Sequence, residues 1–326
     1  MTNSNPEQRK LIRFGNSSYI IAIPKPWISK NKLKKGDLLF VEETPNNELI
    51  IKTKADKSKE TKTIDIDIGG KDINSIEREL TSVYINNYSE INITGKNLNQ
   101  RSNAITKAVQ DKIGLEISDQ NNEKIIIKDI LDLEAISLEK TIRRLDNMIR
   151  AIFEEIGEGV NSGKIKDWTL KEIYSIDQGI NKFYFLSWKL IRKCQEDPRI
   201  LSKFKLDSRK LSDIQWVVLH LEQIGDELKR LAKILHNNGV LNQKELSLAL
   251  NDLEKSYVDM INSYYNKDLI SARKLATRKK ERMDQYEKLF FSKSNNIKKG
   301  TESVVEKLKS LTGSIHNISR VIGYYL

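Results

Sequence analysis

The spacing of hydrophobic residues changes along the chain, and each change predicts a different kind of structure. Two runs in the first part of the chain are typical of strands. Isoleucines alternate with Asp65 and Asp67 in Thr63–Ile68, whereas Tyr19–Ile23 is apolar throughout, as in a strand buried on one or both faces. From about Ser137 onward, the apolar positions recur every three to four residues, as they do on one face of a helix. The pattern therefore predicts a β-containing first part followed by a long helical region.

Residues 9–53 contain several short β-rich runs separated by turn residues. The runs are Lys10–Phe14, Tyr19–Ile23, Leu38–Glu42 and Glu48–Lys52. The predicted turns are Gly15-Asn16-Ser17, Pro24-Lys25-Pro26, Gly36-Asp37 and Pro45-Asn46-Asn47. A unit of about 45 residues buries little of its unfolded surface, so we expect oligomerisation or docking to complete it.

A second group of short elements follows residues 54–62, which lack apolar periodicity and predict a solvent-exposed linker. The predicted elements are a strand at Thr63–Ile68, a helix capped by Asp72, a strand at Glu90–Thr94, a helix near Asn99–Ile113 and a strand at Glu123–Lys128. Together they predict a small α+β module at residues 55–132. Its polar residues form no recognisable catalytic group, so we interpret it as a spacer or dimerisation domain.

The rest of the chain predicts six helices in two groups of three. The candidate helices are Ser137–Asn161, Leu170–Gln195, Leu211–His236, Gln243–Tyr265, Lys267–Phe291 and Lys299–Leu326. The simplest interpretation is two tandem three-helix bundles at 133–239 and 240–326, and one continuous six-helix bundle is the alternative. The predicted fold class is multidomain α+β, with a small β-rich domain at 1–54, the α+β module and an all-α region.

Charge adds a functional expectation to this outline. The chain has a net charge of +11, and the stretch from Arg9 to Lys35 contains eight Lys or Arg residues and no Asp or Glu. Such an excess favours a polyanionic partner such as nucleic acid. A single cysteine, Cys194, excludes an intrachain disulfide framework, and no apolar run reaches membrane-spanning length. We therefore expect a cytoplasmic protein without membrane insertion.

The basic stretch also carries a recognisable motif. Basic residues on the first strand precede Gly15-Asn16-Ser17-Ser18, and an apolar segment then runs into Pro24-Lys25. Leu33-Lys34-Lys35-Gly36-Asp37 comes before the next strand. This arrangement resembles the swapped-hairpin DNA-binding domain of the AbrB/MazE (SpoVT-AbrB) family. The resemblance implies that two chains interleave into one homodimeric domain that binds double-stranded DNA.

The resemblance further implies that Arg9, Lys10, Arg13 and Lys25 contact DNA. Clustered Lys and Arg side chains neutralise phosphates and release counterions, which supplies most of the nonspecific affinity. Arginine can also form bidentate contacts with guanine, so Arg9 and Arg13 are the better candidates for base readout. The alternative is that these cations only solvate a β surface.

A second motif lies in the third predicted helix. The segment Leu221–Ala232 contains Glu222 and Asp226 in a Glu-x-x-x-Asp pattern around Ile-Gly, and it resembles the third-helix motif of PhoU domains. A spacing of four puts both carboxylates on one helical face, where they can hold a hard or borderline cation. The resemblance implies further ligands from the second helix, here Asp177 and Asn181. We expect a divalent or iron-type metal ion on the first bundle, with a solvated acidic face as the alternative.

The second three-helix group departs from the same pattern. Lys280 and Asp284 fall where one acidic pair is expected, and Ser310 and Ser314 fall where the other is expected. A lysine opposes a cation and hydroxyl groups are weak ligands, so we expect no second metal site.

The two motifs together resemble archaeal phosphate-uptake regulators. This resemblance implies a dimeric, DNA-binding transcriptional regulator of phosphate transport genes, whose helical bundles sense metal, phosphate status or a transporter component. The alternative is a PhoU-like adaptor that negatively regulates a phosphate ABC transporter ATPase through protein contacts. Gly69-Gly70 lacks the further residues of a phosphate loop, and no catalytic constellation is evident. We expect neither a nucleotide cofactor nor enzymatic activity.

Overall fold

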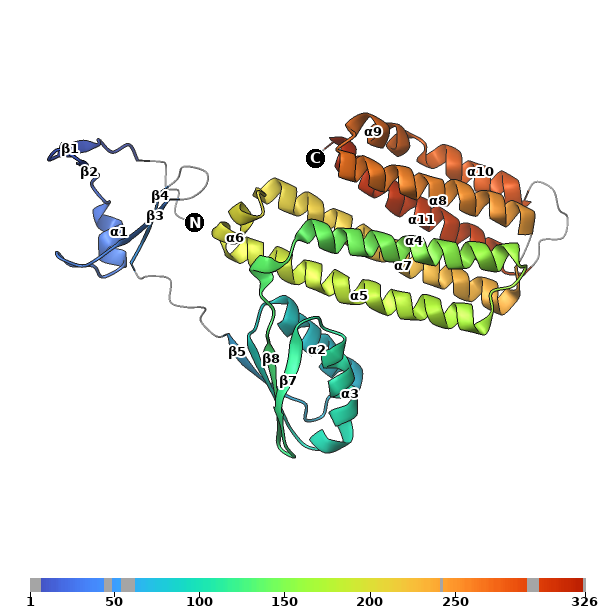
Figure 1. Cartoon of the computed structure of the whole chain (residues 1–326), viewed down its shortest axis with the longest axis horizontal. Coiled ribbons are helices and arrows are strands. Elements are labelled where there is room, and N and C mark those ends of the chain that lie inside the picture. Colours follow the sequence, from blue (N-terminus) through green and yellow to red (C-terminus); the bar gives the residue numbers. More distant parts are fainter. Residues whose placement is uncertain (1–6, 44–48, 54–61, 241–242, 292–298, 325–326) are drawn as a thin grey trace. The chain divides into compact units, whose positions relative to one another are not determined.

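The computed structural model describes residues 7–43, 49–53, 62–240, 243–291 and 299–324 of the chain. It divides into two compact units, Met1–Glu60 and Thr61–Leu326, coloured blue and cyan-to-red respectively in Figure 1. The first unit is β-rich, and the second combines a β-containing module with a helix-rich part, so the predicted multidomain α+β class is confirmed. The predicted linker at 54–62 lies, except for its last residue, outside the described residues.

The first unit contains two antiparallel hairpins joined by a short helix. Strand β1 (Ile12–Phe14) pairs with β2 (Ser18–Ile20), and β3 (Phe40–Glu43) pairs with β4 (Leu49–Lys52). The turn predicted at Pro24-Lys25-Pro26 is wrong, because helix α1 (Lys25–Lys30) begins there. Proline fits the first turn of a helix, where its missing N–H would have no helical partner and its fixed φ is already suitable.

The α+β module at the start of the second unit has a four-stranded sheet covered by two helices. Its strands are β5 (Thr63–Asp67), β6 (Glu90–Thr94), β7 (Leu115–Gln120) and β8 (Lys124–Asp129), in the spatial order β5-β6-β8-β7. Helices α2 (Ile73–Ile85) and α3 (Leu98–Gln110) pack against the sheet and share its core. The side chain of Asp72 caps α2 by accepting from the backbone N–H of Ser75, as predicted. Strand β7 was not predicted, because this edge strand has mostly exposed or half-buried side chains.

The helical part follows a short 3₁₀ turn at Leu133–Ala135. Its helices are α4 (Leu138–Asn161), α5 (Asp167–Glu196), α6 (Pro198–Lys203), α7 (Ser208–Asn238), α8 (Gln243–Asn266), α9 (Leu269–Thr277), α10 (Lys279–Phe291) and α11 (Thr301–Tyr324). Helix α7 packs along α11 and α4 along α8, so the first and second helical groups share one hydrophobic core. This arrangement favours the continuous bundle over two separate ones. Among the described residues, no helix is both long and apolar enough to cross a membrane.

The helix predicted at Lys267–Phe291 is wrong as a single element, because it breaks at Arg278. The buried positions of α9 end at Ala276, and those of α10 begin at Arg282. In a continuous helix these two residues would point about 120° apart, because each residue advances the helix by about 100°. The break therefore allows both segments to face the core, a requirement that the apolar spacing alone did not reveal.

The α+β module is fixed to the bundle by a lysine buried in α5. The ammonium of Lys189 lies 2.7 Å from a carboxylate oxygen of Asp129 and donates to the backbone carbonyl of Tyr84 at 3.0 Å. The same ammonium lies 4.5 Å from the centre of the Tyr84 ring. Phe185, one turn earlier on α5, packs against the core of the module. A buried, fully paired charge and an aromatic contact thus hold the two parts of this unit together.

Candidate functional site

The β1–β2 hairpin places Arg13 on the face opposite to Ile12 and Ile20. Arg13 pairs across the hairpin with Tyr19, whereas Ile12 pairs with Ile20. Side chains alternate between the two faces of a strand, so Arg13 and Tyr19 share one face while Ile12 and Ile20 share the other. Gly15 has φ +67° in the connecting turn, a conformation that costs glycine little. The local sequence therefore places an arginine and a tyrosine together on an exposed surface.

The other predicted DNA-contacting residues lie near this hairpin in the sequence, and all are accessible. Arg9 and Lys10 lie two to three residues before the first residue of β1, and Lys25 is the first residue of α1. Arg9 lies 2.6 Å from the carboxylate of Glu7, a pair of partly exposed side chains. Among the residues that the structure describes, Lys10, Arg13 and Lys25 have no ion-pair partner. Exposed ion pairs are weak, so even Arg9 can exchange its partner for a phosphate.

Large apolar side chains of this unit are exposed to solvent. None of its described residues is buried, and Phe14 and Tyr19 are 65% and 63% exposed. The exposed apolar residues are Leu11, Ile12, Phe14, Tyr19, Ile20, Ile21, Leu38, Phe40, Val41 and Leu49. A hairpin unit without a buried core is not expected to be stable alone, and apolar surface of this extent marks an interaction site.

The acidic residues predicted as metal ligands meet at the α5–α7 contact, together with a lysine. The ammonium of Lys229 lies 2.8 Å from a carboxylate oxygen of Asp177 on α5 and 2.7 Å from one of Asp226 on α7. The other oxygen of Asp226 accepts from the guanidinium of Arg230 at 2.8 Å. Asn181 Nδ2 lies 3.4 Å from Asp177 Oδ2. Lysine was not predicted here, although its position three residues after Asp226 places it on the same helical face.

Burial disfavours ionisation of two of these carboxyl groups, those of Glu222 and Asp177. Burial raises the pKa of Glu222 to about 7, and the negative charges of Asp226 and Asp177 act in the same direction. Burial also raises the pKa of Asp177, although the hydrogen bond and positive charge of Lys229 oppose that shift. The pKa of Lys229 is raised by its hydrogen bonds to both aspartates, despite the opposing effect of burial. The cluster therefore favours a charged lysine.

The donor set can be tested against the predicted metal ion. In this arrangement the Lys229 ammonium lies between Asp177 and Asp226, so a metal bound by both carboxylates would have to displace it. Within the described part of the chain, no three His, Cys, Asp or Glu side chains are grouped to hold a metal ion. Metal binding at Glu222, Asp226 and Asp177 stays a prediction, and it requires movement of Lys229.

The corresponding positions of the second helical group differ in their burial. Lys280 and Asp284 are exposed on α10, whereas Ser314 is buried on α11. The expectation that the second group lacks a metal site stays a prediction.

Comparison with known proteins identifies the N-terminal unit. The model of the family described as "Antidote-toxin recognition MazE, bacterial antitoxin" matches residues 12–59. Domains of the MazE/AbrB type commonly bind DNA and dimerise, and this match fits a DNA-binding regulatory role. No curated protein and no solved structure matches the chain. The predicted AbrB/MazE resemblance is thus confirmed, while the resemblance of the helical part to PhoU domains stays a prediction.

Proposed function

We propose that the chain is a dimeric transcriptional regulator that binds duplex DNA through its N-terminal unit and controls phosphate-uptake genes. The observation that carries the DNA-binding part is the match to the MazE-type family at residues 12–59, a segment that includes the hairpin with the exposed Arg13. A DNA ligand also favours a cytoplasmic location. The helical part serves as the sensing or interaction region in this proposal.

The exposed apolar side chains support a dimer in which a second copy completes the N-terminal unit. Ile12 and Ile20 lie on one face of the hairpin, and Phe40 and Val41 of β3 are also exposed. The same surface in a second chain is self-complementary by symmetry, as an isologous dimer interface requires. Interleaving the two copies would give each N-terminal unit the buried core that it lacks. No other protein would be needed to cover the exposed apolar side chains.

The opposite face supports contact with the DNA backbone and bases. Arg13 and Tyr19 share this face, and Arg9 and Lys10 lie just before the strand. A dimer would present two such sets, and a surface with repeated cations and no buried acid suits a duplex. Lys25 adds a further cation at the start of α1.

The link to phosphate uptake rests on the resemblance of Leu221–Ala232 to the PhoU motif. This segment lies in α7, where Glu222 and Asp226 flank the contact with α5. We propose that this cluster responds to a divalent or iron-type cation only when Lys229 moves aside. A sensing role for the bundle would then depend on competition between the ammonium and the metal ion.

The DNA-binding proposal is tested by measuring duplex affinity against salt concentration. The full chain should lose affinity with a log–log slope of about −0.9 per phosphate neutralised, and Arg9→Ala with Arg13→Ala should flatten the slope by about 1.8. Lys233→Ala with Lys244→Ala removes the same charge from exposed helical positions and serves as the control. Equal salt slopes for both double variants would refute the assigned interface.

The choice of target genes is tested by selecting bound DNA fragments with the full chain. Enrichment of sequences upstream of phosphate transporter genes is expected. The alternative outcome is that the chain binds no DNA but captures a phosphate transporter ATPase in a pull-down, both with and without residues 1–54. In that case the adaptor role replaces the role of transcriptional regulator.

A further inference from the structure

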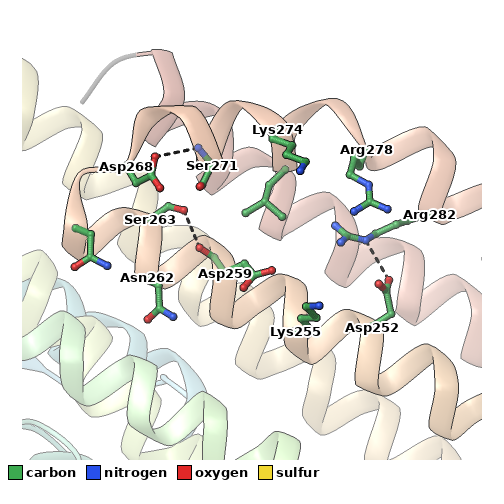
Figure 2. A pocket seen from close by; sticks show the side chains of 12 residues that line it. Asp252, Lys255, Asp259, Asn262, Ser263, Asp268, Ser271, Lys274, Arg278 and Arg282 are labelled. Atoms are coloured by element: carbon green, nitrogen blue, oxygen red, sulfur yellow. Dashed lines mark hydrogen bonds and ion pairs between the residues drawn. The ribbon is translucent and has the colours of Figure 1, made fainter.

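A polar hollow lies between α8 and the broken helix formed by α9 and α10. Its volume is about 450 Å³, and Leu275 is the one apolar residue among those that line it. Figure 2 shows Lys274, Arg278 and Arg282 along one side, with Lys255 and Asp259 across from them on α8. A hollow of this size accommodates a small molecule, and its lining indicates recognition by charge and hydrogen bonds.

The helical break concentrates positive charge beside this hollow. The ten residues from Arg273 to Arg282 contain six Lys or Arg residues and one acid, Glu281. These six cations belong neither to the N-terminal basic motif nor to the acidic cluster of α5 and α7. Arg278 and Arg282 are one turn apart, since the backbone N–H of Arg282 donates to the carbonyl of Arg278. Two guanidinium groups therefore stand beside the hollow, each with a carboxylate partner.

Most carboxylates around the hollow already have partners. Asp252 Oδ2 accepts from Arg282 Nε at 3.1 Å, which anchors a guanidinium group whose residue is only 6% exposed. Asp268 caps α9 by accepting from the backbone N–H groups of Ile270 and Ser271. Asp259 is the remaining acid of the lining.

Several cations of the lining, by contrast, keep donors for a ligand. Across the described residues, the ammonium groups of Lys255 and Lys274 have no hydrogen-bond or ion-pair partner. Arg278 is paired through Nε with the exposed carboxylate of Glu281 at 3.2 Å. Its other guanidinium nitrogens carry four more N–H donors, which suit the oxygens of a phosphate group.

We propose that this hollow binds a small anion that carries two or more phosphate groups. Cations stand on both sides of the hollow, Lys255 on α8 and Lys274 with Arg278 on the broken helix, so they can hold separate phosphate groups of one ligand. None of the described residues that line the hollow is aromatic. The ligand is therefore recognised through its phosphate oxygens and not through a stacked base. The role of the hollow as an effector site rests on the proposed regulatory function. Binding of the phosphate-containing ligand does not itself require DNA.

The test is calorimetric titration of the full chain with pyrophosphate at about 0.15 M salt, where exposed charges are well screened. Saturable binding is expected, and Lys274→Gln with Arg278→Gln should weaken it at least tenfold. Lys171→Gln with Lys244→Gln removes two exposed cations elsewhere on α5 and α8 and should leave affinity within about twofold. Thermal unfolding checks that the variants fold. The single substitution Lys274→Gln removes no hydrogen bond or ion pair among the described residues, and it should still weaken pyrophosphate binding several-fold.

Further titrations distinguish the possible sources of the phosphate groups and the role of the site. Triphosphate and ATP should bind as pyrophosphate does, while sulfate at equal concentration should not compete. Absence of saturable pyrophosphate binding, equal losses in both double variants, or binding of ATP alone would overturn the proposal. The Arg9→Ala, Arg13→Ala chain should bind pyrophosphate normally, so failure of the DNA-binding proposal is read separately from failure of this site.

Discussion

Replacing Lys229 by methionine tests how the charge cluster between α5 and α7 is stabilised. The substitution keeps a long apolar side chain but removes the ammonium that contacts Asp177 at 2.8 Å and Asp226 at 2.7 Å. Asp226 retains Arg230 as a partner at 2.8 Å. Asp177, whose side chain is 9% exposed, retains only the weak contact with Asn181 at 3.4 Å.

The expected cost follows from the unpaired carboxylate. Removing one partner of a fully buried ion pair destabilises a protein by about 3–5 kcal/mol. The Lys229 side chain is 19% exposed, so water already screens part of the interaction. We therefore expect Lys229→Met to lower the free energy of unfolding by about 2–3 kcal/mol at neutral pH.

The deficit should depend on pH in a defined direction. Burial already raises the pKa of Asp177 in the folded protein, and loss of Lys229 raises it further. A carboxyl group whose folded pKa exceeds its unfolded pKa contributes stability at low pH, and this contribution is lost as pH rises through the folded pKa. The difference in stability between wild type and Lys229→Met should therefore be smallest at acidic pH and should grow as the pH rises to neutral.

Urea unfolding followed by circular dichroism measures these differences. Lys233→Met is the matched control, because Lys233 is exposed one turn further along α7, and its cost should stay within about 0.5 kcal/mol. Adding Asp177→Asn to Lys229→Met should recover most of the lost stability. A cost below about 1 kcal/mol, or no recovery in the double variant, would refute the role assigned to Lys229. Mn²⁺ should stabilise Lys229→Met more than wild type, and equal effects would argue against competition between lysine and metal.

Three further substitutions test other parts of the second unit. Lys189→Met removes the cation paired with the Asp129 carboxylate, so it should lower the free energy of unfolding by about 3 kcal/mol and speed amide hydrogen exchange in the α+β module. Unchanged exchange would contradict the anchoring role. Gly114→Ala should cost about 2–3 kcal/mol in urea unfolding, because φ is +86° and the new Cβ would lie 2.7 Å from Leu131 Cβ. Asp146→Ala should lower the thermal midpoint by several degrees, because two tyrosine hydroxyls that donate to its carboxylate at 3.0 and 3.2 Å lose their acceptor.

The order and type of most elements could be predicted because they depend on local backbone geometry. The periodicity of apolar residues located helices such as α4 and α8 closely, and Asp72 marked the start of α2. The errors also have local causes. Pro24 and Pro26 are compatible both with a turn and with the first turn of a helix. The edge strand β7 has too few buried positions to show an alternating pattern of apolar residues.

The candidate sites were predictable only in part. The basic residues and turn motif around Arg13 indicated the N-terminal unit, and the family match at 12–59 confirmed its type. Tyr19 as the cross-strand neighbour of Arg13 required the hairpin register. Lys229 was not predicted as a partner of Asp177, because the two residues are 52 positions apart and belong to different helices.

Taken by itself, the amino-acid sequence determined the β-rich start, the helical remainder and the concentration of cations before Lys35. These properties follow from residue type and from spacing within a single element. Only the tertiary structure decided that Lys229 bridges α5 and α7, and that Arg278 and Arg282 face α8 beside a hollow. Such contacts depend on how distant helices rotate to bury their apolar faces, and one break in a helix redirects every charged side chain that follows it.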